Sequence, residues 1–81
     1  MMIEVRLFAG LAEEAGTRSL ALPADENMTV ERLKHLLAER FPYLQNKIAQ
    51  CMVAVNQEYA EDKTTVSNKD EIVLIPPVSG G

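Results

Sequence analysis

Residues 28–42 read MTVERLKHLLAERFP, and this stretch decides how the rest of the chain folds. Thr29 is a typical helix N-cap residue, and Met28 and Leu33 occupy the two positions of a hydrophobic staple around it. Pro42 cannot continue a helix, so the helical pattern ends before it. At about 100° per residue, the apolar side chains fall on one stripe, at Val30, Leu33, Leu36, Leu37 and Phe41. The stretch therefore predicts one main amphipathic helix whose leucine stripe is core rather than a binding groove.

Short strand patterns lie on both sides of this helix. Residues 3–7 alternate apolar and charged side chains, which is the pattern of a half-buried strand. In this alternation Phe8 falls on the same outward-facing side of the strand as the charged residues. The predicted elements, in order, are a strand at 3–7, a helical turn at 11–15 ended by Gly16, a strand at 19–22, the main helix at 30–40, a turn at 43–49, a strand at 52–55, an edge strand starting at Tyr59 and a strand at 71–75. One helix packed across one mixed sheet fits this order, so we expect an α+β fold. If the last strand lies beside the first, its end delivers the C-terminal tail to one edge of the domain.

Size and charge narrow the classes of function. The chain has 81 residues and a net charge of −4, which predicts one domain with a modest core. An acidic chain is a poor match for nucleic acid, and it favours a partner with a basic surface. The sequence shows no signal-peptide pattern and no apolar run long enough to cross a bilayer, so we expect no membrane contact and a cytoplasmic location.

The C-terminal residues 76–81 read PPVSGG and form a distinct segment after the last strand. Fully extended, six residues reach about 20 Å, at roughly 3.3 Å each. Pro76 and Pro77 favour a stiff, extended exit, whereas Gly80 and Gly81 have no Cβ and can enter a narrow channel. A terminal carboxylate, with a pKa of about 3.3 to 3.7, is ionised at neutral pH and resists nucleophilic attack. It would therefore first need conversion to an acyl adenylate or a similar ester by a separate enzyme. A sulfur nucleophile could then displace the AMP and leave a thiocarboxylate.

Several stretches then agree with one known family. The ending PPVSGG follows DEIV at 70–73, VAVNQEY occupies 53–59, and LFA at 7–9 is followed by Leu11. Together they closely resemble the small, sulfur-carrying subunit of molybdopterin synthase, a ubiquitin-like β-grasp sulfur carrier. The resemblance spans essentially the whole chain, and the proline-proline-valine-serine-diglycine ending is its most specific part.

The resemblance implies a ubiquitin-like β-grasp domain at 1–75 with a flexible functional tail at 76–81. It implies that an activating enzyme of the ubiquitin-activating type uses ATP to adenylate Gly81, and that a sulfur donor protein then supplies sulfur for a thiocarboxylate there. No bound cofactor and no metal are expected on the chain itself. Because the chain ends at Gly81, we expect no proteolytic maturation.

The same resemblance implies a division of labour with a large subunit. The tail would insert into that subunit through Pro76, Pro77, Val78, Ser79 and Gly80. Sulfur would pass to a cyclic pyranopterin precursor and build the dithiolene of the molybdenum cofactor. Phe8, Leu11 and Ile75 would face the partner, and the catalytic residues would belong to the large subunit. Two carriers on a dimeric large subunit would form a heterotetramer.

Other residues have simpler interpretations. Cys51 precedes an apolar strand and is expected to be a small buried hydrophobe rather than a sulfur relay. His35 lies opposite the apolar stripe of its helix and is expected at the surface. The acidic pairs at 13–14, 61–62 and 70–71 are expected to be solvated. Phe8 could also be a core residue if a bulge breaks the strand pattern.

Three other functions stay open at this point. The chain could carry sulfur for another pathway, such as thiamine biosynthesis. It could be a ubiquitin-like modifier joined to lysines through the same activated glycine. It could also be a β-grasp adaptor that binds through its sheet, for which Gly81 would be dispensable.

Overall fold

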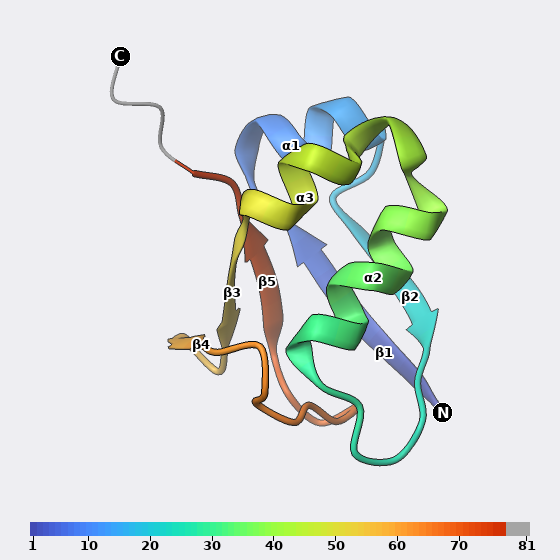
Figure 1. Ribbon diagram of the computed structural model, residues 1–81, viewed down its shortest axis with the longest axis vertical. Helices are drawn as coiled ribbons and strands as arrows, with labels where there is room; N and C mark the ends of the chain where they lie inside the picture. The colour runs from blue at the N-terminus through green and yellow to red at the C-terminus, as the bar shows by residue number, and fades with distance from the viewer. Residues whose placement is uncertain (78–81) are drawn as a thin grey trace.

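The computed structural model describes residues 1–77 and places one five-stranded mixed sheet against a layer of helices (Figure 1). The elements are β1 (Met2–Leu7), α1 (Ala9–Ala15), β2 (Ser19–Pro23), α2 (Val30–Arg40), a 3₁₀ turn (Pro42–Leu44), α3 (Gln45–Gln50), β3 (Met52–Val55), β4 (Glu58–Ala60) and β5 (Ile72–Ile75). The strand order is β2-β1-β5-β3-β4, with β1 and β5 parallel and the other neighbours antiparallel. The predicted α+β fold and the pairing of the last strand with the first are confirmed.

Helix α2 begins and ends at the residues that its sequence indicates. The Thr29 hydroxyl accepts a hydrogen bond from the Arg32 backbone N–H at 3.2 Å, as an N-cap should. Val30, Leu33 and Leu37 are buried, whereas His35 on the opposite side is exposed. The stripe therefore packs into the core, as predicted.

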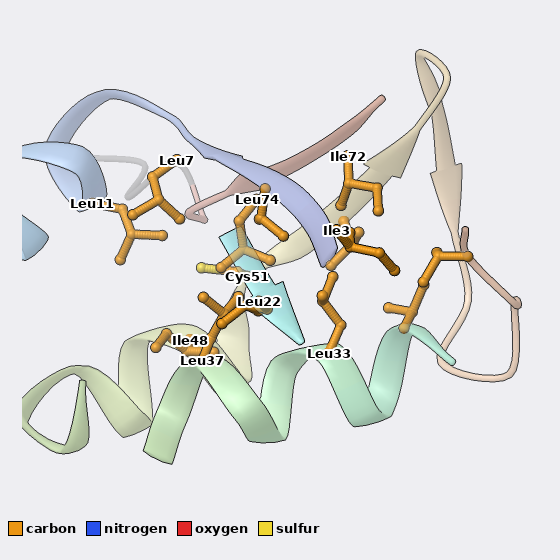
Figure 2. Packing of buried hydrophobic residues seen from close by; sticks show 14 of the residues in the cluster. Ile3, Leu7, Leu11, Leu22, Leu33, Leu37, Ile48, Cys51, Ile72 and Leu74 are labelled. Carbon is orange, nitrogen blue, oxygen red and sulfur yellow. The ribbon is translucent and has the colours of Figure 1, made fainter. Parts of the chain in front are cut away.

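The core lies between the helices and the inner face of the sheet (Figure 2). Alternation along β1 buries Ile3, Val5 and Leu7 and leaves the charged residues in water. Leu37 on α2 and Leu74 on β5 are both fully buried. None of the helices in the described part of the chain is long and apolar enough to span a membrane.

Helix α1 is longer than the single turn that the sequence predicts, and Gly16 ends it. Gly16 has φ of 79°, a conformation that glycine adopts without a steric penalty. Its N–H donates to the Ala12 carbonyl at 3.0 Å, and the Thr17 N–H donates to the same oxygen at 3.1 Å. These bonds satisfy the last carbonyl groups of the helix and turn the chain toward β2.

Asp70 organises the loop before β5, so the expectation of a merely solvated acidic pair is wrong for this residue. Its carboxylate accepts hydrogen bonds from the Asn56 side-chain amide at 3.0 Å and from the Ser67 N–H at 2.8 Å. Asn56 in turn accepts from the Glu71 N–H at 2.9 Å. The carboxylate thus ties the β3–β4 turn to the start of the central strand.

These contacts make the stability of the fold pH-dependent. The Asn56 amide, followed by the Ser67 N–H, holds the pKa of Asp70 below its ordinary value of 3.8 although burial opposes them. A depressed carboxyl pKa contributes stability above the ordinary value, and that stability is lost as the pH falls through the folded value. We expect Asp70→Ala to lower the free energy of unfolding at neutral pH by about 1 kcal/mol, with the difference vanishing in acid.

Urea denaturation across a pH series measures this difference. Asp25→Ala is the matched control, because Asp25 is exposed and its side chain makes no hydrogen bond within residues 1–77. Equal losses for both variants, or a loss at Asp70 that does not change with pH, would contradict the prediction.

Candidate functional site

The base of the C-terminal tail lies at the end of the central strand. β5 pairs with β1 on one side and β3 on the other, so its position is fixed by two ladders. The Phe8 N–H extends the contact with β1 by donating to the Leu74 carbonyl at 3.1 Å. After Ile75, the half-buried Pro76 and the exposed Pro77 carry the chain out of the sheet beside α3 (Figure 1). The predicted site residues Val78, Ser79, Gly80 and Gly81 lie outside the described residues.

The outer face of the sheet presents apolar side chains near this exit. Phe8 is 56% exposed and Met52 is 50% exposed, and Met52 lies opposite the half-buried Ile75 in the ladder. The structure thus brings Phe8 and Ile75 to the same end of the sheet, where β1 and β5 run parallel. Sequence reasoning missed Met52, because its position opposite Ile75 follows from the pairing of β3 with β5, which the sequence does not reveal.

Leu11 does not belong to this surface, so its predicted partner contact is wrong. Its side chain is 1% exposed and lies beside Leu7 in the core (Figure 2). The reason is local geometry, because α1 starts at Ala9 and the Leu11 N–H closes the first turn on the Phe8 carbonyl at 3.2 Å. This turn points Leu11 inward while Phe8 stays outside.

The exposure of Phe8 predicts a small effect on stability. More than half of its side chain already contacts water, so Phe8→Ala should cost about 1 kcal/mol or less. Leu7→Ala, one residue earlier and 7% exposed, should cost about 2–5 kcal/mol. Chemical denaturation of both variants measures the contrast, and similar losses would mean that Phe8 is a core residue.

On the helical side of the exit, side-chain contacts join α1 to the segment before β3. Lys47 on α3 forms an ion pair with the Glu14 carboxylate. The Tyr43 hydroxyl donates to the Glu14 carbonyl at 3.3 Å. A groove of about 630 Å³ lies here, and Pro76 and Pro77 form part of its wall. The tail therefore leaves the domain between the outer sheet face and this helical groove.

Cys51 is structural in this arrangement. The thiol is buried at 5% exposure and donates to the Lys47 carbonyl at 3.1 Å. Burial raises the pKa of the Cys51 thiol, while Lys34 and Lys47 pull the pKa the other way. A buried, protonated thiol is a poor nucleophile. Within residues 1–77, no three His, Cys, Asp or Glu side chains gather in a way that could hold a metal.

Solved structures place this fold among ubiquitin-like proteins. SAMP1 from Haloferax volcanii superposes with a TM-score of 0.85 at 32% identity, covering 100% of both chains. A chain in the complex of subunits 1 and 2 of the molybdopterin-converting factor from Helicobacter pylori superposes with a TM-score of 0.68 at 26% identity, again covering 100% of both. A ubiquitin from Caldiarchaeum subterraneum shares the fold at 21% identity, with a TM-score of 0.68 and coverage of 100% and 98%. The predicted ubiquitin-like β-grasp fold is confirmed.

The fold and the tail base define a small β-grasp protein of the ubiquitin-like class, with a C-terminal segment leaving from the central strand. The chain belongs to the ThiS family, whose model matches residues 5–81. A curated relative, the molybdopterin synthase sulfur carrier subunit of Arabidopsis thaliana, is 35% identical over 79 residues, covering 98% of this chain and 82% of the relative.

Proposed function

We propose that this chain is the sulfur carrier subunit of molybdopterin synthase and that Gly81 carries the sulfur as a thiocarboxylate. The observation that carries the proposal is the junction of the central strand β5 with Pro76-Pro77, in a chain whose curated relatives bear that name. Two ladders hold this strand, so the tail has a rigid base. The named complex of subunits 1 and 2 from Helicobacter pylori supports a large-subunit partner.

The proposed chemistry begins with activation of the Gly81 carboxylate. One carboxylate oxygen attacks the α-phosphorus of ATP on a separate activating enzyme, releasing pyrophosphate and leaving an acyl adenylate. Sulfur delivered by a donor protein at the oxidation level of sulfide (HS⁻) then attacks the carbonyl carbon. The C–S bond forms as the C–O bond to AMP breaks, so that one oxygen of the carboxyl group is replaced by sulfur. The proposed site of this chemistry is the cytoplasm, where ATP is available.

The second stage takes place on the large subunit. The tail carries the thiocarboxylate into that subunit, where the sulfur attacks a carbon of the cyclic pyranopterin precursor and displaces an oxygen leaving group. Water then cleaves the resulting thioester, which leaves the sulfur on the precursor for the dithiolene and restores the Gly81 carboxylate. The residues of this chain bind and position, and the partners supply the catalytic groups. Six residues extended at roughly 3.3 Å each reach about 20 Å beyond β5, enough for a buried active site.

Intact-mass spectrometry tests the first stage. The chain is incubated with its activating enzyme, ATP and a sulfur donor, and the expected mass increase is the difference between sulfur and oxygen. Adding the large subunit and the pyranopterin precursor should then return the mass to its starting value. An unchanged mass with an enzyme that is active on another carrier would contradict the proposal. Loading without discharge would instead favour a carrier for another pathway.

Protein modification is a second candidate function, because the chain resembles the modifier SAMP1 with a TM-score of 0.85. A curated relative from Haloferax volcanii is named small archaeal modifier protein 1, and it is 33% identical to this chain. A lysine amine, in place of sulfur, would then attack the Gly81 adenylate and form an isopeptide bond. Tryptic peptides from cell extracts with the C-terminal residues of this chain on lysine would favour this function.

A further inference from the structure

A second groove lies beside the end of β1, on the other side of α1 from the groove that Pro76 and Pro77 line. It is the larger of these two grooves. Its volume is about 870 Å³. It lies between the end of β1, helix α1 and the α1–β2 connection, and Val73 on β5 contributes to its wall. Ala9 and Ala12 supply small apolar walls, and the exposed Phe8 supplies an aromatic one.

Two arginines give this groove a positive character in an otherwise acidic chain. Arg6 comes from β1 and Arg18 from the loop before β2, and both are exposed. Neither guanidinium forms an ion pair or a side-chain hydrogen bond within residues 1–77, where the single ion pair joins Lys47 to Glu14. Among the described residues that line the groove, Glu13 is the one with a carboxylate, and it pairs with neither arginine. The groove thus offers two free guanidinium groups, which bind carboxylates in a bidentate geometry.

The backbone connects this groove directly to the tail base. Arg6 lies opposite Val73 in the parallel ladder, and Val73 is two residues before the end of β5. The Phe8 N–H donates to the Leu74 carbonyl. A protein that takes a six-residue tail into its active site must approach to within about 20 Å of β5, which brings this groove within its reach.

We propose that the groove docks an acidic segment of the enzyme that adenylates Gly81, an inference that rests on the proposed function. Carboxylates of that segment pair with Arg6 and Arg18, and an apolar side chain packs against Phe8. Charge complementarity favours an acidic occupant, because neither guanidinium group has an ion-pair partner within residues 1–77 of a chain whose net charge is −4. Exposed charge pairs accelerate encounter and weaken with salt. Such contacts suit an enzyme that must release the carrier after each round of activation.

Steady-state kinetics of adenylation tests the proposal. The full chain is the substrate, and the activating enzyme comes from the organism that makes this chain. The double variant R6Q/R18Q should raise KM for the carrier about tenfold, with kcat unchanged, because two exposed charge contacts are lost. It should also flatten the salt dependence of kcat/KM. R6K/R18K keeps the charges and should recover part of the affinity.

The matched control is R40Q/K63Q, which removes the same charge from two exposed residues outside the groove. Its KM should stay near that of the unmodified chain, and thermal melts should show all variants folded. An R6Q/R18Q variant with unchanged KM and salt dependence would overturn the docking inference and leave the proposed function intact. An equal rise in KM for the control would overturn it too, by showing a net-charge effect. No adenylation of the unmodified chain would instead count against the proposed function.

Discussion

Deletion of Gly81 is expected to abolish sulfur loading while leaving the domain folded. The deletion shortens the tail by roughly 3.3 Å, so the new terminal carboxylate stops short of the ATP α-phosphorus. A misplacement of about 1 Å already slows an enzymatic step about 100-fold, and this one is larger. ATP–pyrophosphate exchange and intact-mass spectrometry should therefore show a loss of at least about 100-fold.

Gly81→Ala distinguishes the effect of the length of the tail on sulfur loading from the effect of the width of its last residue. This variant keeps the length and the carboxylate but adds a Cβ to a residue proposed to enter a narrow channel. We expect a loss smaller than that of the deletion, with thermal melts of both variants matching the unmodified chain. Full loading of the deletion variant would contradict the proposed role of Gly81 and would favour an adaptor that binds through its sheet.

The elements with a strong local signal were predictable from the sequence. Helix α2 and strand β3 run over the residues expected for them, Val30–Arg40 and Met52–Val55. Thr29 explains where the helix begins, because its side chain caps the first turn, and Pro42 explains where it ends, because proline lacks a backbone N–H donor. Both effects act within one helical turn. The alternation in β1 likewise indicated which side chains are buried. Interactions between residues close in the sequence decide these features, so the features can be predicted without knowing the fold.

The features that sequence reasoning missed depend on contacts between distant segments. The family resemblance implied that Leu11 faces the partner together with Phe8, but α1 starts early enough to turn Leu11 into the core. Asp70 looked like one of several acidic residues until the fold placed Asn56 beside it. Arg6 and Arg18 line one groove only because β1 pairs with β2. Pairwise geometry of this kind has no periodic signal in a single sequence.

Leu74→Ala is expected to remove a large share of the stability of the domain. Leu74 is fully buried on the central strand, lies opposite Leu7 in the β1 ladder and lies opposite Val53 in the β3 ladder. Truncation of a buried leucine costs about 3–5 kcal/mol through lost transfer energy and the cavity left behind. A domain of this size has about 4–12 kcal/mol of stability in total. Urea denaturation should show the loss, and hydrogen exchange should show it throughout the sheet.

Val73→Ala is the matched control, because Val73 lies one residue earlier on the same strand and is only half-buried on the outer face. Its cost should stay below about 1.5 kcal/mol. Comparable costs for the two variants would contradict the assignment of the core to one face of β5. Adenylation rates distinguish a loss of folding from a loss of chemistry, since the proposed function assigns the catalytic groups to the partners. Per folded molecule, the Leu74→Ala chain should be activated with the same kcat as the unmodified chain, and only the folded fraction should fall. A lower kcat at equal folded fraction would mean that the packing under β5 also positions the tail.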